Sequence, residues 1–122
     1  MKPVRHIVTQ QQINDILDNE LKDYVFPVKP IYNSQIKNNG QTVAIVNSLG
    51  QTVRIKAIEI GKQDMPDRIF LIDTLLHEYF EAEILLKQNI EPKYKKLHMS
   101  DDDKRHSWIN KQISDYFKRR EK

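Results

Sequence analysis

The chain has 122 residues, of which 39% are apolar and 30% charged, and it contains no cysteine. This length supports one modest core, so residues 1–122 are predicted to form a single domain. The lack of cysteine excludes disulfides and thiolate ligands, so a metal here would need imidazole and carboxylate groups. No apolar run approaches the roughly 20 residues that cross a bilayer, and the first residues do not resemble a signal peptide. A cytoplasmic protein with no membrane partner is therefore expected.

Positive charge is concentrated in the last quarter of the chain. Residues 93–122 hold ten of the 20 Lys and Arg residues but five of the 17 acidic ones, so they carry +5 and the remainder −2. A basic segment can bind nucleic acid, but this one lacks interleaved aromatic residues and a recognised binding motif. A solvated helix end is favoured instead, because Lys118, Arg119 and Arg120 suit a helix C-terminus.

The N-terminal part of the chain predicts a helix. Thr9-Gln10-Gln11-Gln12 has the form of a capping box, and apolar residues follow it at helical spacing as far as Tyr24. The helix should run from about Thr9 to Asp23. Pro27 and Pro30 then end it.

Three strands are predicted next, at residues 31–36, 42–46 and 52–60. Asn39-Gly40 and Leu49-Gly50 supply the turns between them. Such short connections favour an antiparallel meander, because parallel neighbours need a longer crossover. The apolar alternation of the third strand slips near its end, and a bulge or an edge position would explain the slip.

Two helices are predicted in the second half of the chain. Asp64-Met65-Pro66-Asp67 supplies an N-cap, an early proline and an acid for the longest helix, which should run to about Gln88. Residues 90–99 are expected to form an irregular linker. Residues 100–103 cap a last helix, whose predicted buried stripe is Ile109, Ile113, Tyr116 and Phe117. The expected fold class is α+β: a helix, a three-stranded antiparallel sheet, and two further helices.

The longest helix carries the residues that could perform chemistry. His77 and Glu81 are four positions apart, so they present an imidazole and a carboxylate to one point and form two ligands of a metal ion. Glu78 points about a quarter-turn away and would lie beside the metal, where a carboxylate can take a proton from water. It is the candidate general base.

A catalytic zinc usually has three protein ligands and one open position, so a third ligand must come from elsewhere in the fold. His106 is the first candidate, because it precedes Ile109 by three residues and should face inward on the last helix. His98, in the linker, is the alternative, because linkers can fold over a site. Asp73 and Asp102 each lie four residues before a candidate histidine and could orient its ring.

Two segments of the chain together resemble the core of a small zincin metallopeptidase. They are Ile58-Glu59-Ile60-Gly61 and Asp73-Thr74-Leu75-Leu76-His77-Glu78-Tyr79-Phe80-Glu81-Ala82. In that family an edge strand leads into a helix bearing His-Glu-x-x-His. The resemblance is at motif level over residues 58–82 and in element order over about 9–117. It implies a zincin-like domain that hydrolyses peptide bonds in a peptide or protein substrate, with a divalent metal, zinc first. The substrate would lie antiparallel along residues 52–60 if that strand is a sheet edge.

The resemblance also assigns roles: His77 as first ligand, Glu78 as general base, Glu81 at the position of the second ligand and His106 as the third. The family has His where this chain has Glu81, and a carboxylate ligand lowers both Lewis acidity and selectivity for zinc. The substitution could equally signal a lost site, so the alternative is a catalytically inactive zincin-like interaction protein of phage or mobile-element type. A purely structural role, in which His77 and Glu81 stabilise the helix as an i, i+4 pair, is the third interpretation.

Overall fold

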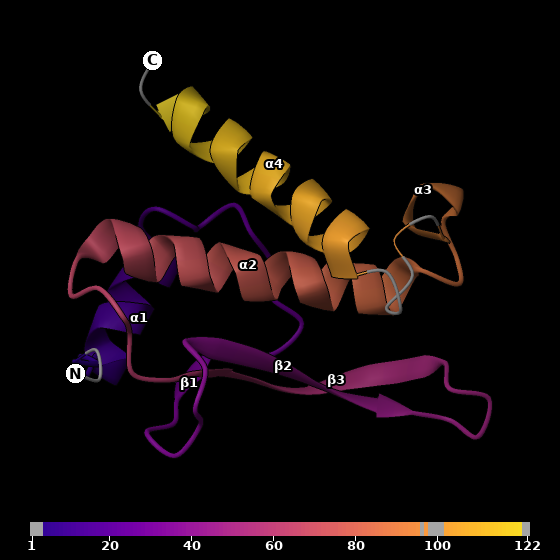
Figure 1. The fold of residues 1–122 in the computed structure, drawn as a ribbon, viewed down its shortest axis with the longest axis horizontal. Coiled ribbons are helices and arrows are strands. Elements are labelled where there is room, and N and C mark those ends of the chain that lie inside the picture. Colours follow the sequence, from indigo (N-terminus) through magenta and orange to yellow (C-terminus); the bar gives the residue numbers. More distant parts are fainter. Residues whose placement is uncertain (1–3, 96, 98–101, 121–122) are drawn as a thin grey trace.

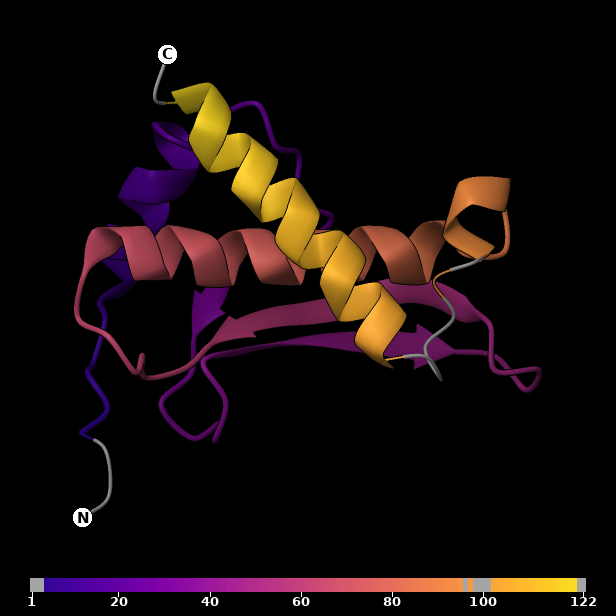
Figure 2. The same ribbon diagram turned by 45° about the horizontal axis from the view of Figure 1, so that its top comes forward.

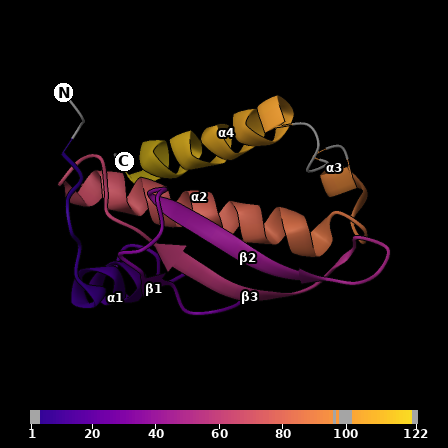
Figure 3. The same ribbon diagram turned by 60° about the horizontal axis from the view of Figure 1, so that its bottom comes forward.

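The computed structural model describes residues 4–95, 97 and 102–120, so His98 lies outside the described residues. In chain order its elements are α1 (Gln10–Asp18), β1 (Ile31–Tyr32), β2 (Gly40–Val46), β3 (Thr52–Ile60), α2 (Arg68–Lys87), α3 (Pro92–Lys95) and α4 (Asp102–Arg120). The fold is α+β, as predicted, and α2 lies between the sheet and α4 (Figure 1 and Figure 3). Within these ranges no helix combines the length and apolar character that crossing a membrane requires.

The long helix α2 forms the centre of the molecule. Asp67, and not the predicted Asp64, caps it by accepting a hydrogen bond from the Phe70 backbone N–H at 2.6 Å. Because α4 crosses α2 obliquely on the side away from the sheet (Figure 2), α2 is buried on two faces. Its buried residues therefore spread beyond a single helical stripe and include Phe80 and Ile84.

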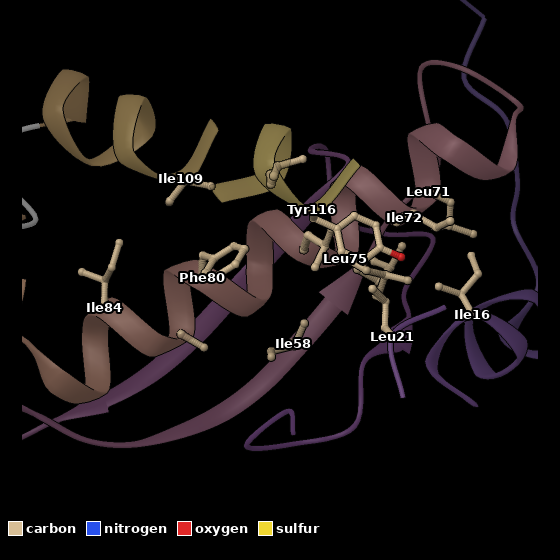
Figure 4. Packing of buried hydrophobic residues seen from close by; sticks show 14 of the residues in the cluster. Ile16, Leu21, Ile58, Leu71, Ile72, Leu75, Phe80, Ile84, Ile109 and Tyr116 are labelled. Carbon is tan, nitrogen blue, oxygen red and sulfur yellow. The ribbon is translucent and has the colours of Figure 1, made fainter. Parts of the chain in front are cut away.

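The core joins the three layers through α2. Figure 4 shows Ile109 of α4 above α2 and Ile58 of β3 below it. Three residues of the predicted stripe of α4 are buried, namely Ile109, Ile113 and Tyr116, and Phe117 is only partly buried. The capping box at Thr9 is also confirmed, but α1 ends at Asp18, five residues before the predicted end. The chain then continues through turns to the strands.

The sheet is mixed, so the predicted antiparallel meander is wrong. Its strand order is β1-β3-β2, with β2 antiparallel and β1 parallel to β3. The argument from short connections fails because β1 is only two residues long and pairs with Glu59 and Ile60 at the very end of β3. A chain can cross the end of a strand in a few residues, whereas crossing a full sheet face needs a helix.

Gly61 permits this crossing. A Cβ atom at residue 61 would lie 2.3 Å from the backbone oxygen of Asn38, in the segment that passes over the end of β3. The Gly61 backbone N–H donates to the Asn39 carbonyl at 2.8 Å. The fully buried Gln63 amide donates to the carbonyls of Asn39 and Gly61 at 2.7 and 2.8 Å. The crossing is thus tight and its polar groups are paired.

Gly61→Ala is expected to lower the free energy of unfolding by about 2–3 kcal/mol, because the new methyl group meets backbone that cannot move aside cheaply. Urea denaturation measures this loss. The matched control is Gly50→Ala in the β2–β3 turn, where nothing lies within 4 Å of the added Cβ and the φ of 77° costs about 1 kcal/mol. Equal losses for the two variants would contradict the close crossing at Gly61.

The predicted slip in the third strand is a bulge. Val43 lies opposite Ala57 and Ala44 opposite Ile55, so Lys56 has no partner of its own on β2. The extra residue shifts the alternation, which turns Ile58 as well as Ile55 inward. The strand can therefore keep apolar residues on the core face despite its irregular sequence pattern.

Candidate metal centre

Three of the predicted site residues converge where α4 crosses α2. One ligand atom each from His77, Glu81 and His106 lies within 4.8 Å of the other two. Glu81 Oε1 is 3.7 Å from His77 Nε2 and 3.7 Å from His106 Nε2. The tertiary fold therefore brings together two adjacent turns of one helix and the first turns of another.

These separations fit the ligands of a divalent ion. Metal bonds of 2.0–2.2 Å in a tetrahedral arrangement place two ligand atoms about 3.4 Å apart. A shift of a few tenths of an ångström would bring Glu81 Oε1 to that spacing from each imidazole nitrogen. The ligand atoms of the two imidazoles lie within 4.8 Å of each other, so these rings would approach further on binding an ion. Two imidazoles and one carboxylate leave a fourth position open, which is the usual composition of a catalytic zinc site.

The protonation of His77 also suits a ligand. Burial lowers the pKa of its imidazole, and the neighbouring His106 and Arg105 act in the same direction, against the opposing carboxylates of Glu81 and Asp73. A neutral ring offers a lone pair to a metal, whereas a protonated ring offers none. His77 is therefore in its ligating form at neutral pH.

Glu78, the candidate general base, is almost completely buried against β2. Its Oε1 atom accepts a hydrogen bond from the Thr42 hydroxyl at 3.0 Å. A Cβ at Gly40 would lie 3.0 Å from Glu78 Cγ, so the glycine makes room for this side chain. Burial raises the pKa of Glu78 to about 7, although the Thr42 hydrogen bond lowers it. The carboxyl group can thus hold or release a proton near neutral pH.

A cavity of about 450 Å³ opens beside these two residues. His77 and Glu78 line it together with Asp73 and Thr74 of α2. Phe70 of α2 also lines it, and its other walls come from the chain before and at the start of β2 and from two segments distant from it in sequence: Lys37, Asn38, Asn39, Gly40, Arg5 and Asp64. Glu81 and His106 are not among the lining residues, so the cluster meets the cavity through His77. A small substrate segment could reach His77 and Glu78 from this side.

Arg105 is a charged partner of the cluster that sequence reasoning missed. It is buried, and its Nε atom donates to Glu81 Oε1 at 3.1 Å, the same oxygen that faces both imidazoles. Its Nη2 atom donates to Asp102 Oδ1 at 2.6 Å. Asp102 therefore pairs with Arg105. Among the described residues, no hydrogen bond joins Asp102 to His106, so the predicted role of Asp102 in orienting that ring is not supported.

Helical spacing contained a signal for Arg105. The buried residues of α4 are Arg105, Ile109, Ile113 and Tyr116, at intervals of four, four and three. A charged residue in an apolar stripe requires a buried partner of opposite charge, and Glu81 is that partner. The inward position predicted for His106 belongs instead to Arg105, while the His106 side chain is 48% exposed and reaches Glu81 from the edge of the helix.

The arrangement can bind a divalent ion at three side chains, hold a proton at Glu78, and admit a substrate through the cavity. Thr42 and Gly40, which fix Glu78, had no sequence signal because their contact with α2 is created by the packing of β2 against that helix. Comparison of the chain with models of protein families, with curated proteins and with solved structures found no match.

Proposed function

We propose that this protein is a metal-dependent hydrolase of zincin-like construction that cleaves peptide bonds. The observation that carries the proposal is the convergence of ligand atoms of His77, Glu81 and His106 within 4.8 Å. The buried carboxyl group of Glu78 follows His77 directly on α2. His77, Glu81 and His106 hold the metal, with zinc as the first candidate. The bound ion supplies Lewis acidity, which lowers the pKa of water at the site.

Glu78 performs the proton transfers in this proposal. Its pKa of about 7 lets the carboxylate accept a proton from the attacking water and return it to the leaving amine. Thr42 restrains the carboxyl group through its hydrogen bond to Oε1. The apolar surroundings and the packing against Gly40 keep bulk water from solvating the ionised form, which is the physical cause of the raised pKa.

The substrate path differs from the one expected from the sequence. β3 is the central strand in the sheet order, and the edge strand beside Glu78 is β2. Gly40, at the start of β2, lines the cavity together with His77 and Glu78. We therefore place an extended peptide along the free edge of β2, where main-chain hydrogen bonds are available.

Purified protein is expected to bind about one equivalent of zinc, manganese or iron and to be stabilised by it. At a metal concentration 100 times the dissociation constant, the free energy of unfolding should rise by about 2.7 kcal/mol. Metal analysis gives the stoichiometry, and thermal unfolding with and without chelator gives the stabilisation. Stability that ignores every added divalent metal would contradict the proposal.

A second candidate function is supported by Arg105. Because its guanidinium already neutralises Glu81, the fold can persist without a metal, as in a non-catalytic interaction protein that retains this architecture. Under this function the biological effect of the protein should survive chelation and the Glu78→Gln substitution. Loss of the effect in either case would reject it.

A further inference from the structure

Arg105 donates to the same Glu81 oxygen that a divalent ion held by His77, Glu81 and His106 would use. We infer that Arg105 is the internal cation of the metal centre: it competes with a divalent ion for the Glu81 carboxylate and so sets the affinity of the site. This inference rests on the proposed metal-binding function. It assigns Arg105 a positioning role, because the guanidinium acts through Glu81 and touches no reacting group.

The competition centres on one oxygen atom. Glu81 Oε1 accepts from Arg105 Nε at 3.1 Å and lies 3.7 Å from the nearest nitrogen of each imidazole. An ion bound by these three ligands would share that oxygen with the guanidinium. Two cations beside one carboxylate repel each other, and the repulsion is strong where water is scarce.

Arg105 is held in this position from two sides. Its side chain is 8% exposed, and the hydrogen bond to Asp102 Oδ1 at 2.6 Å ties the other end of the guanidinium to the first turn of α4. The planar fork can therefore serve both carboxylates at once. Moving it away from Glu81 would require moving the start of α4 or breaking the contact with Asp102.

The burial of Arg105 also shows what the charge is used for. The side chain lies in the same stripe as Ile109 and Ile113, where an apolar residue would pack without any desolvation cost. Its positive charge is opposite to that of Glu81, whose side chain projects from α2 into the same contact and is 11% exposed. In the metal-free protein, Arg105 thus supplies the positive charge that the buried carboxylate requires.

Two substitutions separate charge from shape. Arg105→Gln removes the charge but keeps an amide that can donate to Glu81, whereas Arg105→Lys keeps the charge without the fork. Zn²⁺ or Co²⁺ is titrated into chelator-treated protein, and the dissociation constants are compared by calorimetry. Arg105→Gln should bind about tenfold more tightly or better, the scale on which neighbours of ligands act, and Arg105→Lys should bind no more tightly than the wild type. Lys111→Met, which removes a charge from an exposed position of α4, should change the constant less than about twofold.

The outcomes distinguish this inference from the proposed function. A merely structural role predicts weaker binding after loss of Arg105, so unchanged or weaker binding by folded Arg105→Gln overturns the inference and leaves the metal site intact. Binding by Arg105→Gln alone, with none by the wild type, supports the inference and rejects the proposed hydrolase. Absence of binding by both rejects both. If Arg105→Gln does not fold, Arg105→Lys decides, because tighter binding by that variant contradicts a competing charge.

Discussion

Glu78→Gln should abolish hydrolysis while making the metal-free protein more stable. As the general base of the proposed reaction, Glu78 contributes about 10²–10⁴-fold to the rate, and an amide cannot replace it. The same side chain weakens the fold when ionised, because burial raises its pKa from 4.5 to about 7. The difference between these two values corresponds to about 3 kcal/mol.

The sign of the pH dependence follows from proton binding. Between about pH 4.5 and 7 the unfolded chain has released the Glu78 proton while the folded protein still keeps it. The wild type therefore loses stability as the pH rises through this window, and the loss is complete above it. The free energy of unfolding of Glu78→Gln should exceed that of the wild type by about 3 kcal/mol at about pH 8 and by less than about 1 kcal/mol at about pH 5.

Urea denaturation in chelator at both pH values measures the stability of Glu78→Gln, and cleavage of a mixture of unstructured peptides measures its activity. Glu83→Gln is the matched control, since Glu83 lies on the same helix and pairs with Lys87 at 2.8 Å. It should keep the activity and show no gain in stability at the higher pH. A stability difference between Glu78→Gln and the wild type that does not grow with pH would refute the buried carboxyl argument. Peptide cleavage by Glu78→Gln at the wild-type rate would refute the role of Glu78 as general base.

His77→Ala is expected to remove metal-dependent stabilisation. Residues that merely support a ligand change metal affinity by about 10–100-fold, so loss of a ligand itself should exceed 100-fold. The variant should also fold, because the His77 side chain is 30% exposed and its removal leaves no apolar cavity in the core. Its unfolding temperature in chelator should therefore remain close to that of the wild type.

Titration of Zn²⁺ into His77→Ala, followed by thermal unfolding, measures this loss. His6→Ala provides the control, because His6 contacts Gln63 through a backbone bridge and lies outside the cluster. It should retain the full stabilisation by metal. Equal stabilisation of both variants by the metal would mean that the ion binds elsewhere on the folded protein.

Taken together, these variants bear on a common property of the site. Glu78, Glu81 and Arg105 are charged or titratable groups in the interior, where apolar side chains of similar volume would be cheaper to bury. Groups of this kind persist at functional sites because the chemistry requires them. The gain in stability expected for Glu78→Gln would measure part of that cost directly.

Several features followed from the sequence because they depend on near neighbours in the chain. The capping box at Thr9 is set by residues within a few positions of one another, and the slip in the apolar alternation of β3 marked the bulge. The alignment of His77 with Glu81 is of the same kind, since it follows from the helical repeat alone.

Other features were decided only by tertiary packing. The parallel pairing of β1 with β3, the placement of β2 beside Glu78 and the raised pKa of that group join segments far apart in sequence. Arg105, and not the predicted His106, faces inward on α4. Which of these neighbours does so depends on how α4 is rotated about its axis where it crosses α2, and helical spacing over a single turn does not fix that rotation. The sequence thus determined which side chains could form a metal centre. The crossing of the two helices decided that an arginine shares it.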